Sequence, residues 1–429
     1  MTIQHLHIEN FRGIRQLDLD LAAPVTVLVG ENGAGKSSIL DCLATLLSWY
    51  PARLRSPKGV GARFKQTDIR IAQRTASASI RAAIEEGDGT IEWGQRVART
   101  GSGTSGKVDV AVLTEEVQAR YPGMFFDSVP PYTGTPRGWP PLCVHYSVNR
   151  TVLDIPLRIR GEINLKDRSL AFAGAFNANV NFRTFFSWYR QREDWENEMQ
   201  REEWLDPHKW LDPQLQAVRQ AIHTFTGFAN LRVRRSPLHM EVTKGLQSLW
   251  VNHLSDGEKC LLSMIGDLAR RLAILSGEHL SNPLHAPGMI LIDEIDLHLH
   301  PAWQRRIIPK LVETFPNCQF IVSTHSPQVI SDVRPEAVFL LRQVGDTIVV
   351  THPEDSFGQS SDRILEDLMR VSARPVEIKE ALRSLFEQIS RGDLDTAERD
   401  LALLQQQIGS DPELTWADTT IRRKRVLGE

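Results

Sequence analysis

Residues 30–37 read GENGAGKS, and this stretch decides the fold of the 429-residue chain. It has the spacing G-x-x-x-x-G-K-[ST], follows the apolar run VTVLV at 25–29, and precedes a helical pattern of apolar residues. Glycines at these positions let backbone amides and the N-terminus of the following helix point at a phosphate group. We therefore expect Lys36 to neutralise the β- and γ-phosphates of ATP and the Ser37 hydroxyl to bind Mg²⁺. The residues expected to contact the nucleotide are Asn32, Gly33, Ala34, Gly35, Lys36, Ser37 and Ser38.

A second stretch, MILIDE at residues 289–294, has the form of a buried strand that ends in two carboxylates. At the end of such a strand, Asp293 would hold Mg²⁺ through water and Glu294 would polarise the attacking water. An acid pair in this position also occurs as an ordinary cap of a following helix. Beside a phosphate-binding loop, we favour the catalytic interpretation of Asp293 and Glu294.

Two further motifs have both a structural and a functional interpretation. In LSDGEK, residues 254–259, Ser255 and Glu258 have the spacing of a helix capping box. The same helix N-terminus would also present the Ser255 hydroxyl and the Gly257 amide to a γ-phosphate. In FIVSTHS, residues 320–326, His325 follows a buried strand, where a lone histidine is usually a cap or a core residue. In the company of the other motifs, we expect His325 to contact the γ-phosphate.

Composition and charge argue against several classes of protein. The net charge of -3 gives no global positive field that would steer the chain to nucleic acid. A local basic cluster at Arg232, Arg234 and Arg235, and another at 422–425, are more simply solvated faces than nucleic-acid contacts. The four cysteines are scattered without CxxC spacing, which argues against a zinc site or a disulfide framework and suits a reducing cytoplasm. No signal peptide or bilayer-spanning run is visible, so we expect a cytoplasmic protein with no membrane partner.

The pattern along the chain predicts several regions. From 231 to 345, strand-like and helix-like segments alternate, which implies a parallel sheet covered by helices. Residues 155–230 predict a helical insertion. Residues 376–408 carry two apolar helical stripes joined by RGD at 391–393, which predicts an αα-hairpin. The insertion carries an aromatic stripe of Phe182, Phe185, Phe186 and Tyr189, with Trp195, Trp204 and Trp210 nearby. The simplest interpretation of this stripe is core packing, and the alternative is an interaction surface.

In chain order, the four motifs lie at residues 30–37, 254–259, 289–294 and 320–326. This arrangement identifies the chain as a member of the ABC ATPase class, in which the motifs are called Walker A, signature, Walker B and switch histidine. The sequence DEIDLHLHP at 293–301 resembles the corresponding segment of the SMC/RecF/OLD branch and differs from that of transporter heads. The resemblance covers residues 1–345 in outline. This chain departs from it in three ways. Asp256 stands where transporters have glycine, no coiled-coil arm of SMC length fits, and no clear Q-loop is present, with Gln66 as a candidate.

The resemblance implies an α/β fold, namely an ABC-type P-loop ATPase head with a parallel sheet core and N-terminal antiparallel strands. Residues 1–154 would form the first part of the head, with Walker A, and residues 231–345 the second part, with the signature, Walker B and His325. Residues 155–230 would be inserted between them. Residues 346–429 would form a C-terminal helical extension that docks a partner.

The tail resembles the stand-alone PtuA-type ATPases of Septu and retron anti-phage systems. The matching segments are FGQ at 357–359, DRILEDLM at 362–369 and RP at 374–375. This resemblance implies ATP-sandwiching homodimers or higher oligomers, and a separate HNH nuclease partner of the PtuB type. Nucleic acid (phage DNA, tRNA or retron msDNA) would be met through that complex.

No HNH or Toprim pattern is evident in the sequence, so we expect a Mg²⁺-dependent ATPase without intrinsic nuclease activity. The alternative is a RecF-like DNA-repair ATPase that binds DNA itself. A transporter ATPase subunit is disfavoured by the segment 297–301 and by the helical insertion.

Overall fold

The computed structural model describes residues 1–84, 89–100, 103–121, 139–148, 163–177, 182–201, 211–277 and 282–427. The chain divides into two compact units, Met1–Gln359 and Ser360–Glu429. Trp204, Trp210 and most of the segment 121–141 lie outside the described residues.

Parallel strands form the central sheet of the first unit. In the described part of the chain these strands are β3 (Val25–Gly30), β7 (Leu142–Tyr146), β11 (Gly288–Ile292), β12 (Cys318–Thr324), β13 (Val338–Val344) and β14 (Thr347–Thr351). Their order is β14-β13-β3-β12-β11-β7, and only the β13–β14 hairpin is antiparallel. Every residue of β11 and β12 is buried, as expected for strands covered on both faces. The predicted α/β fold with a parallel sheet is confirmed.

An antiparallel sheet forms the N-terminal side of the same unit. It contains β1 (Thr2–Phe11), β2 (Ile14–Asp20), β4 (Thr75–Ala83), β5 (Thr90–Thr100) and β6 (Gly103–Asp109), in the order β2-β1-β4-β5-β6. The N-terminal antiparallel strands that the resemblance implied are present. Strands β4 and β5 alternate buried with more exposed positions, and the buried positions of β4 are mostly alanines.

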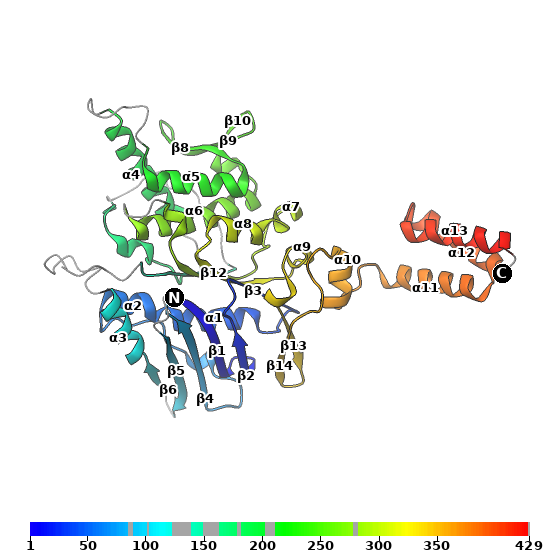
Figure 1. Ribbon diagram of the computed structural model, residues 1–429, viewed down its shortest axis with the longest axis horizontal. Helices are drawn as coiled ribbons and strands as arrows, with labels where there is room; N and C mark the ends of the chain where they lie inside the picture. The colour runs from blue at the N-terminus through cyan, green and yellow to red at the C-terminus, as the bar shows by residue number, and fades with distance from the viewer. Residues whose placement is uncertain are drawn as a thin grey trace. The chain divides into compact units, whose positions relative to one another are not determined.

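Helix α1 (Lys36–Leu47) lies between the two sheets and contacts both. Figure 1 shows α4 (Phe182–Met199), α5 (Pro213–Thr226) and α6 (Asp256–Ser276) stacked on the opposite face of the parallel sheet. A small antiparallel sheet of β8 (Ala229–Arg235), β9 (Leu238–Lys244) and β10 (Gln247–Trp250) adjoins them. The shorter or peripheral helices of this unit are α2 (Trp49–Arg55), η1 (Gln66–Asp68), α3 (Ala111–Arg120), η3 (Arg168–Ala171), η4 (Val251–His253), η5 (Pro283–His285), α7 (Pro301–Gln304), α8 (Ile307–Thr314), α9 (Pro327–Ile330) and η6 (Pro335–Ala337).

The aromatic stripe of the expected insertion is core. Phe182, Phe185, Phe186 and Tyr189 on α4 are all buried. Phe185 packs so closely on α6 that a Cβ on Gly266 would lie 3.0 Å from its ring. The stripe therefore attaches α4 to the head and is not a surface for a partner.

The helical segment between β11 and β12 is interrupted. It forms α7 and α8, which are separated at Arg305–Arg306. Pro309 lacks a backbone N–H, and its ring would clash with the carbonyl of Arg305 in a continuous helix. The helix therefore restarts two residues before the proline.

The second unit is a three-helix assembly preceded by α10 (Ser361–Arg363) and the π-helical turn η7 (Ile364–Leu368). The predicted hairpin is present as α11 (Val376–Arg391) and α12 (Leu394–Ile408), joined at Gly392 with φ 81°. Sequence reasoning missed the third helix, α13 (Pro412–Leu427). The three helices share a core of Leu382, Leu385, Ile389, Ala397, Leu401, Leu404, Leu414, Ala417 and Ile421.

Strand β14 still belongs to the head sheet, so the C-terminal unit begins at Ser360, later than the expected residue 346. In the described parts of both units, no helix combines the length and apolar character needed to cross a bilayer.

Candidate functional site

Three parallel strands deliver the predicted motifs to one edge of the sheet. Strand β3 runs into the loop 30–37, β11 ends before Asp293, and β12 ends before His325. The register aligns these ends, because Thr324 lies opposite Val29 and Ile292 lies opposite Val322. Ligands of open α/β sheets bind outside the carboxyl ends of the strands, so this edge is the expected site.

The loop 30–37 has the backbone that a phosphate cradle requires. Gly33 and Gly35 adopt φ values of 85° and 97°, which disfavour residues with a side chain. At Gly30 a Cβ would lie 2.5 Å from the carbonyl oxygen of Leu341 on β13, so only glycine fits there. Helix α1 begins at Lys36 with Gly35 as its N-cap, so no side chain covers the first amides of the helix. These amides are the groups that bind anions at helix N-termini.

Lys36 is held across this loop. Its side chain is buried, and Nζ donates hydrogen bonds to the carbonyl oxygens of Gly30 at 2.8 Å and Glu31 at 3.0 Å. Burial lowers the pKa of Lys36, while the carboxylates that follow β11 act in the opposite direction. Ser37 is exposed and Ser38 half-buried on the first turn of α1.

The carboxylates after β11 are fixed by two hydroxyls of β12. Ser323 Oγ donates to Asp293 Oδ1 and accepts a hydrogen bond from the backbone N of Glu294 at 2.8 Å. Thr324 Oγ1 donates to Asp296 Oδ1 at 2.5 Å. Glu294 has a φ of 46°, an uncommon conformation for a residue with a side chain, and such strain concentrates at functional sites. Sequence reasoning assigned no role to Ser323 or Thr324, although both lie in the stretch that contains His325.

His325 lies half-buried beside these groups. Its pKa is lowered by burial and by the charge of Lys36, and the carboxylates of Asp293, Glu294 and Asp296 oppose that shift. These electrostatic contacts bring the lysine, the acids and the histidine into one site. Oxygen donors from Ser37 and Asp293 suit Mg²⁺, which prefers hard oxygen ligands.

The signature forms the predicted capping box. The backbone N of Ser255 donates to Glu258 Oε2 at 2.9 Å, and Ser255 Oγ accepts from the backbone N of Glu258 at 3.4 Å. Lys244 Nζ donates to Glu258 Oε1 at 2.6 Å. The side chain of Ser255 is exposed, and within the described chain it hydrogen-bonds only with Glu258. The structure therefore does not join the signature to loop 30–37 of the same chain.

A buried charge network connects the signature helix to the edge of the sheet. Asp267 on α6 accepts hydrogen bonds from Arg270 at 2.7 Å, from Arg271 at 2.6 Å and from the Tyr146 hydroxyl at 3.1 Å. The Tyr146 carbonyl in turn accepts from the backbone N of Asp293 at 2.9 Å. Burial would raise the pKa of Asp267, but the two guanidinium groups hold it at about 2. Sequence reasoning missed this network, whose one signal is a cluster of charges within an otherwise apolar helix.

The remaining candidates lie away from the site. Gln66 is exposed on η1, a short helix that contacts β5 of the antiparallel sheet. No hydrogen bond among the described residues joins Gln66 to loop 30–37.

The basic cluster on β8 is compensated by acids. Arg232 and Arg234 pair with Glu241, and Arg235 pairs with Glu193 and Asp194. These pairs favour the interpretation of this cluster as a solvated face.

Comparisons with known proteins agree with this geometry. A family profile described as "AAA domain" matches residues 5–119, and one described as "AAA domain, putative AbiEii toxin, Type IV TA system" matches residues 149–331. The retron Ec83 probable ATPase of Escherichia coli is 31% identical over 442 residues, covering 88% of this chain and 78% of that protein. The retron Vc95 probable ATPase of Vibrio cholerae serotype O1 biovar El Tor is 28% identical, covering 86% and 80%.

The Septu protein PtuA of Bacillus thuringiensis is 22% identical, covering 86% of this chain and 84% of that protein. Among solved structures, the SMC head bound to the C-winged helix domain of ScpA has a TM-score of 0.47 at 17% identity, covering 82% of this chain and 98% of that one. The predicted resemblance to retron and Septu ATPases is confirmed. The chain belongs to the family of the retron Ec83 probable ATPase, and both profile matches are to AAA domains.

Proposed function

We propose that this chain is the ATP-binding and ATP-hydrolysing subunit of a prokaryotic anti-phage defence complex. The observation that carries the ATPase part is the convergence of Lys36, Asp293, Glu294 and His325 at one edge of the sheet. The loop amides and the side chains of residues 32–38 would bind the phosphates. The defence role rests on the relatives, which are named as retron and Septu proteins.

In this proposal each site residue has one role. Ser37 and Asp293 would hold Mg²⁺, which neutralises phosphate charge when bound. Glu294 polarises the attacking water. Ser323 Oγ holds Glu294 in position by accepting a hydrogen bond from the Glu294 backbone N. His325, whose pKa is lowered, is neutral at pH 7 and approaches the γ-phosphate without adding to the charge of Lys36.

The signature requires a second copy of the chain. Ser255 and Gly257 lie at the N-terminus of α6, where amides and a hydroxyl suit a γ-phosphate. Because Ser255 does not contact its own nucleotide loop, we propose that it closes over the nucleotide bound to a partner. Twofold symmetry then makes two equivalent composite sites.

The C-terminal unit is the proposed docking site for a separate HNH-type nuclease. It has its own core and is not needed to build the ATP site. It also exposes large apolar side chains, with Leu403 63% and Trp416 62% exposed. Nucleic acid would be met through the complex, in keeping with the acid-compensated arginines of β8.

The test is co-expression of the full chain with the product of the neighbouring gene, followed by affinity purification. We expect the nuclease to co-purify with the full chain and with a Lys107→Ala control, and to be lost with Leu403→Asp combined with Trp416→Asp. ATP binding should survive in all three proteins. If the purified chain alone cuts nucleic acid, the partner proposal is wrong. If it binds DNA tightly without a partner, the RecF-like alternative is favoured.

A further inference from the structure

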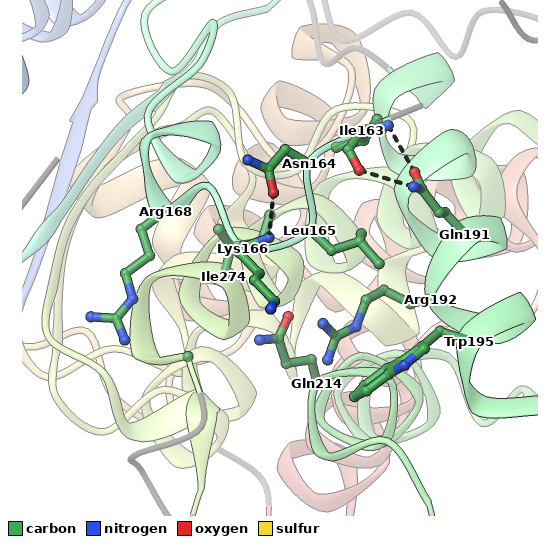
Figure 2. A pocket seen from close by; sticks show the side chains of 11 residues that line it. Ile163, Asn164, Leu165, Lys166, Arg168, Gln191, Arg192, Trp195, Gln214 and Ile274 are labelled. Atoms are coloured by element: carbon green, nitrogen blue, oxygen red, sulfur yellow. Dashed lines mark hydrogen bonds between the residues drawn. The ribbon is translucent and has the colours of Figure 1, made fainter. Parts of the chain in front are cut away.

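A cavity of about 690 Å³ lies away from the phosphate loop. It is formed by α4, α5, the C-terminal end of α6 and the segment 163–168 (Figure 2). Helix α6 has 21 residues, so this end lies about 30 Å from Ser255 at the other end. The cavity is therefore a separate site on the same rigid helix that carries the signature.

The wall of the cavity is held in place by a paired amide. Gln191 Nε2 on α4 donates to the Ile163 carbonyl at 2.9 Å, and the Ile163 backbone N donates to Gln191 Oε1 at 2.9 Å. Figure 2 shows this pair at one side of the cavity. The segment that carries Leu165 and Lys166 is thus fixed to α4 by two hydrogen bonds.

Two buried side chains that line the cavity each have one polar atom without a hydrogen-bond partner among the described residues. Gln214 is 5% exposed, and its Oε1 has no hydrogen-bond partner among the described residues. Arg192 is 6% exposed, and its Nε likewise has none there, although its Nη2 pairs with Asp212 at 2.6 Å. In Figure 2 both side chains point toward the same space, with Lys166 beside them. Buried polar atoms are almost always paired, and a polar ligand in this cavity would provide partners for both atoms.

The charge and shape of the lining define the ligand. Lys166, Arg168 and Arg192 line the cavity, and no carboxylate does so among the described residues. The Arg192 guanidinium lies 5.0 Å from the centre of the Trp195 ring, which forms a planar cationic and aromatic surface. Such surfaces stack on nucleobases, and a cationic side chain such as Lys166 binds phosphate.

We propose that this cavity binds one nucleoside phosphate unit. Lys166 would hold the phosphate, the Trp195–Arg192 surface would stack on the base, and Gln214 Oε1 would accept a hydrogen bond from a base N–H. The volume suits a ligand the size of a single nucleotide. The unit is either a free mononucleotide or one nucleotide of a single strand.

The test is calorimetric titration of the full chain carrying Lys36→Ala, which weakens the phosphate loop as a competing site. The probes are AMP, a 5′-phosphorylated single-stranded tetranucleotide, and inorganic phosphate. The pocket variants are Lys166→Glu and Gln214→Leu, and the control is Lys107→Glu on the exposed face of β6. Gln214→Leu removes an unpaired buried oxygen, so the thermal midpoint of the variant should not fall.

We expect at least one nucleotide probe to bind, and both pocket variants to weaken it about tenfold or more while Lys107→Glu does not. Binding of AMP identifies a free mononucleotide as a sufficient ligand. Binding of the tetranucleotide alone identifies a strand. The proposal is overturned if neither nucleotide probe binds, if both bind equally well to the pocket variants, or if phosphate alone binds as tightly as AMP.

Discussion

The backbone of Gly257 in the signature packs directly against the carbonyl oxygen of His298, so closely that a Cβ on residue 257 would overlap that oxygen. His298 has a φ of 61°, an uncommon conformation for a residue with a side chain. The start of α6 and the segment after Walker B are therefore in direct backbone contact. Both belong to the surface that we propose to meet a second copy of the chain.

Gly257→Ala should uncouple hydrolysis from binding. The added methyl group must displace the segment at His298, whereas loop 30–37 is untouched. We expect the steady-state ATPase rate to fall about tenfold or more and ATP affinity in calorimetry to stay close to that of the parent. Gly13→Ala is the control, because its Cβ meets nothing within 4 Å. A Gly257→Ala enzyme with the parental rate would contradict the proposed role of this contact.

ATP affinity should depend on Lys36. Removing its charge leaves the phosphate oxygens facing backbone amides alone, and hydrogen bonds to charged groups are worth about 1.5–3 kcal/mol. Lys36→Ala should therefore weaken ATP binding about tenfold or more in a calorimetric titration, whereas Lys107→Ala should not. Equal affinity in Lys36→Ala and the parent would mean that the phosphates bind elsewhere.

Hydrolysis should depend on Glu294 more than binding does. Glu294→Gln keeps the shape and the backbone contact to Ser323 but loses the charge that orients water. We expect turnover to fall about a hundredfold or more, since general-base catalysis contributes roughly 10²–10⁴-fold, with ATP still bound. The measurements are the ATPase rate and retention of ATP after gel filtration. The control is Glu313→Gln, at an exposed position of α8. If Glu294→Gln hydrolyses ATP at the parental rate, the general base is another residue.

The sequence predicted the parts of the site that are built from neighbouring residues. Loop 30–37 and the Walker B pair are local, because consecutive residues create both the backbone shape and the chemistry. Contacts between distant segments could not be predicted, since the sequence of neither segment identifies the residue that it contacts in the fold. Ser323 reaches Asp293, 30 residues earlier, and Tyr146 reaches Asp267, 121 residues later.

The dependence on distant contacts also explains which elements of the fold were not predicted. Strand β4, with the sequence TASASIRAA, carries small residues whose alternation gives a weak apolar signal, yet they are buried against neighbouring strands. Helix α13 was missed because its apolar residues are sparse, and it is the packing on α11 and α12 that buries Leu414, Ala417 and Ile421.

Stability should depend on Asp267. Asp267→Asn leaves Arg270 and Arg271 buried without their counter-charge, and breaking a buried ion pair from one side costs about 3–5 kcal/mol. We expect a clear fall in the denaturation midpoint of the first unit, whereas Glu387→Gln in an exposed pair should change it little.

The pH dependence has a defined sign. The folded-state pKa of Asp267, about 2, lies below the ordinary aspartate value of 3.8. Its stabilising contribution is therefore present above about pH 4 and is lost as the pH falls toward 2. Asp267→Asn should remove this part of the acid sensitivity, and a variant with an unchanged midpoint and acid profile would contradict the role of the network.

ATP should bring two copies of the chain together through Ser255. The side chain of Ser255 is exposed at the N-terminus of α6, and its hydrogen bonds within the described chain go only to Glu258. An arginine there would place bulk and charge against a partner's nucleotide without touching loop 30–37 of its own chain. In a Glu294→Gln background, which keeps ATP bound, light scattering should show an ATP-dependent increase in mass that Ser255→Arg abolishes. Ser105→Arg, at an exposed position of β6, is the matched control. Nucleotide affinity should be the same in both arginine variants, so a loss of mass cannot be ascribed to lost ATP. If Ser255→Arg still assembles with ATP as the control does, the signature does not close over a partner's nucleotide.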